Sequence, residues 1–107
     1  MIIISVNKNE KSILKISVSG HAGFNSYGND IVCAGVSAVT FGFLEYLQIT
    51  EEKGITYETF EKENKIVFFL KNQKNKFFDK IFNILYIQLK LIYNNYKKNI
   101  KWIETYE

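Results

Sequence analysis

Residues 20–37 read GHAGFNSYGNDIVCAGVS, and this stretch separates an N-terminal pair of strands from the first long apolar helix of the chain. It contains the only histidine and the only cysteine of the protein, His21 and Cys33. Three glycines lie among its first nine residues, and glycine permits positive φ angles and close backbone approach. This composition predicts a loop that bends sharply, moves or lies against a ligand, with two groups capable of thiol chemistry at its ends.

The second half of this stretch predicts the start of a helix. Asn29 or Asp30 is a good N-cap for a helix over residues 31–48, so Cys33 is expected in the first turn. Helical side chains lean toward the N-terminus, which directs the sulfur back at the loop that carries His21.

The pattern on either side of the stretch predicts one α+β domain over residues 1–107. Alternating apolar residues indicate strands and the 3.6-residue period indicates helices. The strands are expected at residues 2–7, 12–19, 55–60, 65–71 and 100–104, and the helices at residues 31–48 and 74–98. The order ββαββαβ, with hairpins rather than repeated βαβ units, predicts a mainly antiparallel sheet with two helices.

Both predicted helices carry unusual surfaces. Gly35, Ala38 and Gly42 form a stripe of small residues, which indicates close contact with another backbone or with substrate. The second helix is apolar over a wide arc. Its main stripe comprises Phe78, Ile81, Phe82, Leu85, Leu89, Ile92 and Tyr96, and a second set comprises Phe77, Ile84 and Leu91. Either this helix is sandwiched inside the domain, or it also pairs with a second subunit.

The net charge of +3 comes from lysine alone, because the chain has no arginine. Arginine reads phosphates and guanines in bidentate fashion, so its absence argues against sequence-specific recognition of DNA. The lysines concentrate in residues 71–101, and acidic residues concentrate in residues 45–63. The simpler interpretation of these charged segments is that they form solvated faces of the protein. The more specific interpretation is that the lysines make a transient contact with ribosomal RNA.

The longest uncharged run, residues 31–44, is shorter than the roughly 20 residues of a membrane span, so it predicts a core helix and no membrane partner. A single cysteine cannot form an internal disulfide, and no signal peptide follows Met1. The expected location is therefore the cytoplasm.

The chemistry of Cys33 and His21 has several interpretations. A lone cysteine in an apolar helix is usually a small buried hydrophobe, and a lone loop histidine is usually solvated. Their joint position at one helix end favours a thiol nucleophile with a nearby base. One cysteine and one histidine are too few for a zinc site, even with Asp30 added, so neither a metal nor another cofactor is expected. Ser37 lies one turn past Cys33 and is expected to line the site or to pack.

The same residues resemble a known family. Gly20-His21-Ala22, followed by Tyr27-Gly28-Asn29-Asp30-Ile31-Val32-Cys33-Ala34-Gly35-Val36-Ser37-Ala38, is similar to the signature of the bacterial ribosomal-processing cysteine proteases called Prp. The resemblance implies a cytoplasmic homodimeric protease that removes the N-terminal extension of bacterial large-subunit ribosomal protein 27, cutting between a glutamine and an aromatic residue.

The resemblance also implies roles for individual residues. Cys33 corresponds to the nucleophile and His21 to the base, while Asp30 and Ser37 match family positions to which the resemblance assigns no settled role. Asp30 is a candidate either to orient His21 or only to cap the helix, and Ser37 is a candidate to line the substrate site. The loop over the site includes Gly20, Gly23, Phe24, Tyr27 and Gly28. Backbone amides at the helix start, that of Cys33 among them, are expected to hold the oxyanion. The alternative is a noncatalytic ribosome-associated module that binds a peptide or RNA.

Overall fold

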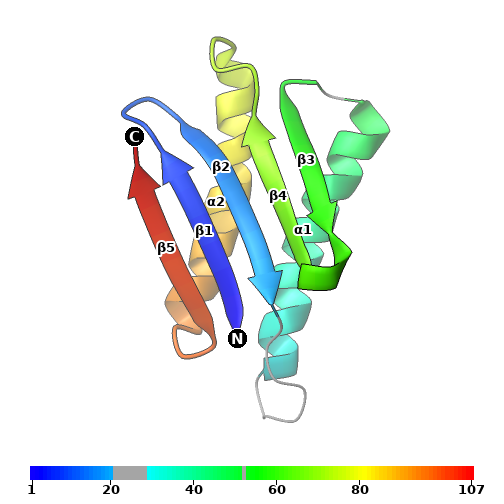
Figure 1. Ribbon diagram of the computed structural model, residues 1–107, viewed down its shortest axis with the longest axis vertical. Helices are drawn as coiled ribbons and strands as arrows, with labels where there is room; N and C mark the ends of the chain where they lie inside the picture. Colours follow the sequence, from blue (N-terminus) through cyan, green and yellow to red (C-terminus); the bar gives the residue numbers. More distant parts are fainter. Residues whose placement is uncertain (21–28, 52) are drawn as a thin grey trace.

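Five strands form one mixed sheet in the order β3-β4-β2-β1-β5, and both helices cover the same face of it (Figure 1). The computed structural model describes residues 1–20, 29–51 and 53–107. The elements are β1 (Ile2–Lys8), β2 (Ile13–Gly20), α1 (Asn29–Thr50), β3 (Ile55–Phe60), a short 3-10 helix (Glu61–Glu63), β4 (Lys65–Leu70), α2 (Lys76–Asn95) and β5 (Ile100–Tyr106). The predicted order ββαββαβ is confirmed.

The strand pairings follow from alternation of apolar and polar residues. β1 pairs antiparallel with β2, and β4 pairs antiparallel with β2 on one side and with β3 on the other. The single parallel pair joins β1 to β5, beginning at Ile2 opposite Ile100. Because successive residues of a strand point to opposite faces, this register gathers one apolar set on the face toward the helices.

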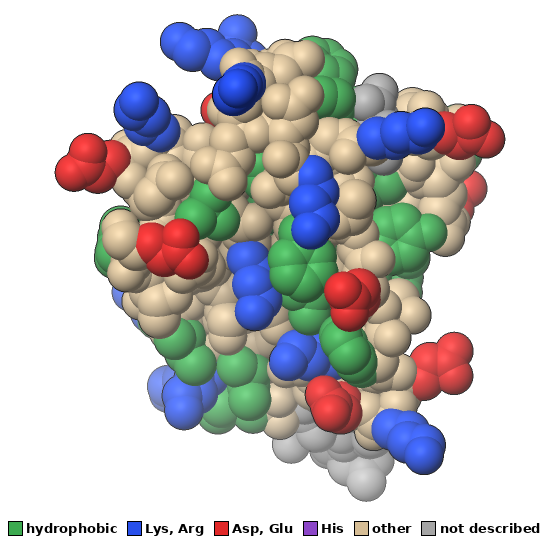
Figure 2. All heavy atoms as spheres, turned by 45° about the horizontal axis from the view of Figure 1, so that its top comes forward, with side chains coloured by type: hydrophobic (Ala, Val, Ile, Leu, Met, Phe, Trp, Pro, Cys, Tyr) green, Lys and Arg blue, Asp and Glu red, His purple; other side chains and the backbone are tan. Residues whose placement is uncertain are grey.

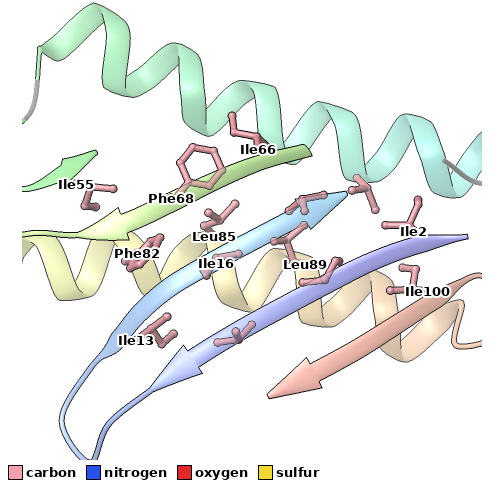
Figure 3. Packing of buried hydrophobic residues seen from close by; sticks show 14 of the residues in the cluster. Ile2, Ile13, Ile16, Ile55, Ile66, Phe68, Phe82, Leu85, Leu89 and Ile100 are labelled. Carbon is pink, nitrogen blue, oxygen red and sulfur yellow. The ribbon is translucent and has the colours of Figure 1, made fainter. Parts of the chain in front are cut away.

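The hydrophobic core lies between this face and the two helices (Figure 3). Phe68 of β4 and Phe82 of α2 are fully buried there, and each contributes roughly 1.5–3 kcal/mol through burial of apolar surface. Phe43 of α1 packs edge-to-face on Phe68, with ring centroids 5.3 Å apart. The aromatic rings thus join α1, α2 and the sheet in one core.

Among the described residues, no helix covers the other face of the sheet (Figure 1). Figure 2 shows lysine side chains interspersed with hydrophobic side chains over this face. Lys15 and Lys71 both lie over the ring of Phe69, with their Nζ atoms 5.9 Å and 5.5 Å from its centroid. Lysine stems cover apolar surface while the charged heads stay in water. Part of the basic charge is therefore a solvated sheet face, as the simpler interpretation predicts.

The first helix begins earlier than predicted and is longer. It starts at Asn29, so Asp30 lies inside the first turn. The sequence predicts an N-cap at Asn29 or Asp30 and a helix that starts at residue 31. Both predictions are wrong, because these two residues belong to the helix itself. The segment Ile31–Thr50 of this helix has a mean hydropathy of 1.4 and is long and apolar enough to cross a membrane. The uncharged run of residues 31–44 is too short to cross one, so the sequence did not predict this. Core helices pass the same test, and Val32 and Leu47 of α1 are buried in the core.

The stripe of small residues on α1 approaches α2 at Gly35, and an apolar groove of about 650 Å³, lined by Ala38 and Gly42, runs between the two helices. A side chain at Gly35 would be in contact with Ile92 of α2, whereas one at Gly42 would meet nothing within 4 Å. The predicted close contact with another backbone is therefore found at neither glycine: a Cβ at Gly35 would lie 3.7 Å from the side-chain Cδ1 of Ile92, an ordinary distance, and Gly42 faces the open groove.

The second apolar set of α2 is not sandwiched inside the domain. Phe77 is 52% exposed, Ile84 is 54% exposed and Leu91 is 62% exposed. Ile87 on the same side is 62% exposed as well. The described part of this chain therefore leaves an apolar outer surface on α2 uncovered.

Candidate active site

A cavity of about 530 Å³ opens between the first half of α1, the C-terminal end of β2 and the turn that joins β3 to β4. This volume lies within the usual range for sites that hold a small ligand or a side chain. Its floor is formed largely by apolar residues of the sheet, among them Val18 and Ile66. Ile66 and Ile2 are seen between the sheet and α1 in Figure 3.

Cys33 lies in the wall of this cavity. Its thiol is free, and the residue is half-buried, packed against the hydrophobic core on one side and lining the cavity on the other. Val36, Ser37 and Thr40 follow it on the same wall. The spacing i, i+3, i+4 and i+7 places these residues on one face of the helix. The predicted proximity of Ser37 to Cys33 is thus reproduced by the structure.

The earlier start of α1 changes the expected oxyanion donors. Cys33 is the fifth residue of the helix. A residue at that place donates its amide to the carbonyl four residues earlier, here that of Asn29. The amide of Cys33 is therefore not one of the free donors at the helix start, contrary to the prediction. The free donors are the amides that precede it in the first turn.

The end of β2 is fastened to the turn between β3 and β4. The amide of Gly20 donates to the carbonyl oxygen of Asn64 at 3.2 Å. The side-chain Nδ2 of Asn64 donates to the carbonyl oxygen of Gly20 at 3.4 Å. Gly20 has φ of +86°, and a Cβ at this position would overlap the main-chain oxygen of Met1. Glycine is therefore required where the chain leaves the sheet toward His21.

Five of the predicted site residues lie outside the described residues. These are His21, Gly23, Phe24, Tyr27 and Gly28. Asp30 belongs to the first turn of α1, and its side chain lies outside the described part as well. The structure therefore brings together Cys33, Ser37 and Gly20 around one cavity.

Sequence reasoning missed several residues of this cavity. Thr40 lines it from α1, and Thr59, Asn64 and Lys65 line it from the β3–β4 side. The helical spacing of Thr40 from Cys33 was a usable signal. The residues of the turn could not be found in this way, because their position depends on the pairing of β2 with β4.

A second polar cluster surrounds Glu104 of β5. Lys8 forms an ion pair with its Oε1 at 3.0 Å. The Tyr86 hydroxyl and the Trp102 indole N–H donate to its Oε2 at 2.8 Å and 2.7 Å. Partial burial alone would raise the pKa of Glu104, but these donors and the charge of Lys8 lower it from 4.5 to about 2.

The pKa of Lys8 is affected in the opposite direction. Burial alone would lower the pKa of Lys8, but its hydrogen bonds to Tyr86 and Glu104 raise it. Both groups are therefore held in their charged forms, and the cluster ties β1 to β5 and α2. In residues 1–20, 29–51 and 53–107, no three His, Cys, Asp or Glu side chains gather as a metal site.

The fold and the cavity define a small α+β protein with one thiol facing a cleft near the start of a helix. Residues 1–101 match the family model described as "Cysteine protease Prp". The chain therefore belongs to the Prp family of cysteine proteases.

A curated relative and two solved structures agree with this assignment. The ribosomal processing cysteine protease Prp of Bacillus subtilis (strain 168) is 41% identical over 61 residues, covering 48% of this chain and 54% of the relative. The match thus spans about half the length of that relative.

The solved structures are of a ribosomal processing protease Prp from S. aureus. Its complex with a substrate peptide has a TM-score of 0.83 at 24% identity, covering 98% of this chain and 100% of that one. Its complex with a covalently linked product peptide has a TM-score of 0.82 at 24% identity with the same coverage. At this identity the likeness establishes the fold.

Proposed function

We propose that this chain is a cysteine endopeptidase in which Cys33 is the nucleophile and His21 is the base. The observation that carries the proposal is the free, half-buried thiol in the wall of a cavity, near the start of α1, in a chain of the Prp family. A helix start favours the thiolate form of a nearby cysteine, and the thiolate is the attacking species.

The proposed reaction runs through a thioester. His21 takes the proton of the Cys33 thiol, and the sulfur attacks the carbonyl carbon of the scissile peptide bond. Backbone amides in the first turn of α1 stabilise the oxyanion. The carbon–nitrogen bond breaks as His21 returns the proton to the leaving amine. Water then hydrolyses the thioester and regenerates the free thiol.

The proposed substrate is the N-terminal extension of bacterial large-subunit ribosomal protein 27, cut between a glutamine and an aromatic residue. The names of the relatives support a substrate of ribosomal origin. The S. aureus structure was solved with a substrate peptide. A cavity of about 530 Å³ beside the thiol has room for one large substrate side chain.

The test uses a synthetic peptide with a Gln-Phe junction, incubated with the protein and followed by mass spectrometry. We expect cleavage at the junction by the wild type and none by Cys33→Ala. His21→Ala is expected to lower kcat by at least about 100-fold, the usual contribution of a general base. Ser5→Ala, on the helix-free face of the sheet, is the matched control and should cleave normally.

The outcomes separate the possible roles. Cleavage by Cys33→Ala would contradict the thiol mechanism, and undiminished cleavage by His21→Ala would contradict only the base assignment. Binding of the intact peptide without cleavage by the wild type would indicate the noncatalytic peptide-binding alternative.

The proposed assembly is a homodimer that buries the outer apolar surface of α2. Phe77 and Ile84 line the groove between the helices and are more than half exposed. Ile49 adds exposed apolar area on α1. Exposed apolar area of this extent is typical of a surface that meets another protein.

Sedimentation analysis of the wild type and of Ile84→Lys tests the assembly. A lysine at this position would bring two like charges into the apolar interface, so we expect the variant to be a monomer at concentrations where the wild type is a dimer. Ser5→Lys adds the same charge on the sheet face and should leave the dimer unchanged. A monomeric wild type would contradict the assembly.

A further inference from the structure

Positive charge is concentrated on the face of the sheet that the helices leave uncovered (Figure 2). The strand register turns three lysines toward this face, namely Lys15, Lys65 and Lys101. Lys71, directly after β4, lies over the same face. Within the five described strands, the acidic side chain on this face is Glu58 of β3. Four lysines against one glutamate leave the face at +3, which equals the net charge of the whole chain.

None of these four lysines has a carboxylate within ion-pair distance in residues 1–20, 29–51 and 53–107. The ion pairs of this part of the chain join Lys8 and Lys90 to Glu104, which contacts α2 on the other side of the sheet. Positive charge without a neighbouring acid attracts a polyanion. The uncovered face therefore has the electrostatic character of a surface that binds one.

Two aromatic rings lie among these lysines. The ring of Phe69 lies beneath Lys15 and Lys71. The ring of Phe60 has the Nζ atom of Lys65 at 5.8 Å from its centroid. Phe60 pairs with Lys65, four residues along β4 from Phe69, so the two rings are about 13 Å apart along the strands. Each ring is thus a separate platform with a cation at its side.

Flat rings beside free cations match the chemistry of a single-stranded nucleic acid. The bases of such a strand stack on aromatic rings, and its phosphates contact lysines. A duplex is a poorer match, because its bases are already stacked on one another. A lipid surface is a poorer match, because Val67 at the centre of the face is 3% exposed and inserts nothing. A second copy of the chain would bring two faces of +3 together.

Thr56 favours RNA over DNA as the bound strand. It pairs with Phe69 in the register of β3 and β4, so the two side chains lie beside each other on the uncovered face. A hydroxyl at this place is suited to hydrogen bond the ribose 2′-OH of a nucleotide that stacks on Phe69. DNA lacks this group.

We propose that the helix-free face of the sheet binds single-stranded RNA. Bases stack on the rings of Phe69 and Phe60, and the lysines around the rings contact phosphates. The chain has no arginine, so each phosphate contact is a point charge without the bidentate fork, and binding is independent of base sequence. This is a further function beside the proposed peptidase, and it does not depend on the peptidase.

The test is fluorescence anisotropy of a labelled ten-nucleotide oligouridine at several salt concentrations. We expect the wild type to bind with a Kd of about 1–100 μM near physiological salt. Lys15→Gln with Lys71→Gln should weaken binding and lower the slope of log affinity against log salt by about 1.4 in magnitude.

The matched control is Lys80→Gln with Lys97→Gln, which removes two charges from the side of the helices. The Nζ atom of Lys97 lies 5.9 Å from the ring centroid of Tyr93, the same distance as Lys15 from Phe69. The control should change the affinity by less than about twofold, because these charges are far from the bound strand and are screened by salt.

Two further variants separate stacking and sugar recognition from charge. Phe69→Leu should lower the affinity at least about fivefold with an unchanged salt slope, because leucine is apolar but has no ring on which a base can stack. The wild type should prefer oligouridine to its deoxy counterpart by about fivefold, and Thr56→Val should lose this preference. Melting temperatures verify that each variant is folded.

Equal losses of affinity in the two lysine pairs would overturn the inference, because they would indicate general attraction of a polyanion. Undiminished binding by Phe69→Leu would overturn it as well, and so would tighter binding to phosphatidylserine vesicles than to oligouridine. The assay contains no peptide, so a wild type that fails to bind RNA leaves the peptidase function standing. RNA binding by a wild type that cleaves no peptide would support this inference and contradict only the peptidase.

Discussion

At Glu104 a single carboxylate gathers donors from β1, α2 and β5. The structure holds its pKa at about 2, well below the 4.5 of an ordinary glutamate. The Glu104 carboxylate therefore binds a proton less readily in the folded state than in the unfolded state. The ionised Glu104 therefore makes its full contribution to stability above about pH 4.5, and this contribution is lost as the pH falls toward 2.

This carboxylate gives the first prediction. Glu104→Gln should lower the free energy of unfolding at neutral pH, and its deficit relative to wild type should shrink between about pH 4.5 and about pH 2. Urea denaturation followed by circular dichroism across this range measures both curves. Glu58→Gln, exposed on β3, is the control that should change stability little. A deficit that stays constant with pH would contradict the depressed pKa.

Two glycines make a matched second prediction. Gly20 has φ of +86° and no room for a Cβ, so Gly20→Ala should destabilise the protein by more than about 1 kcal/mol and slow peptide cleavage. Gly42 is helical and a Cβ there meets nothing within 4 Å, so Gly42→Ala should stabilise it by up to about 1 kcal/mol. Thermal unfolding compares the two. A stabilised Gly20→Ala would contradict the tight exit from β2.

The third prediction concerns the start of α2. The Asn75 Oδ1 accepts a hydrogen bond from the amide of Phe77 at 3.0 Å, which caps the helix. Asn75→Ala should cost about 1 kcal/mol, and Asn75→Ser should restore most of it. The melting temperature measures the difference, with Asn94→Ala in the last turn as the control. Equal melting temperatures for Asn75→Ala and the control would contradict the cap.

The elements were largely predictable because their periods are clear. Ile2, Ile4 and Val6 alternate along β1, and their buried positions follow that alternation directly. The start of α1 was misplaced because Asn29 and Asp30 are common caps and are also tolerated inside a first turn. The exposure of Phe77 and Ile84 could not be decided, because an apolar helix side has the same pattern whether this chain or a partner covers it.

The candidate site could be predicted only for residues that the spacing along one helix brings together. Cys33 and Ser37 lie one helical turn apart, and the cavity confirms that they share a wall. Asn64 and Lys65 reach the same cavity through strand pairing, which sequence periodicity does not specify. The roles of Cys33 and His21 remain predictions that the cleavage assay tests.

For the whole molecule, β5 completes the sheet against β1. Ile100 is 2% exposed and Trp102 packs on the rings of Tyr86 and Tyr93. The fourth prediction is that removal of residues 100–107 abolishes cooperative unfolding, because it exposes one edge of β1 and removes Glu104, the ion-pair partner of Lys8. Circular dichroism melts measure this. Removal of Glu107 alone loses one hydrogen bond, from its amide to the carbonyl oxygen of Lys8 at 2.9 Å, and should lower the melting temperature far less. A cooperative melt without β5 would contradict the prediction.

The parallel pairing of β1 with β5 also concerns the order in which the sheet forms. β1 pairs with β2 through a short hairpin, whereas its pairing of Ile2 with Ile100 joins residues nearly a hundred positions apart in the sequence. Contacts this distant in sequence form late and slowly. Ile2 lines the cavity of Cys33, so β5 contacts the strand that forms part of this cavity. The last pairing to form therefore supports a cavity to which β5 itself contributes no described lining residue.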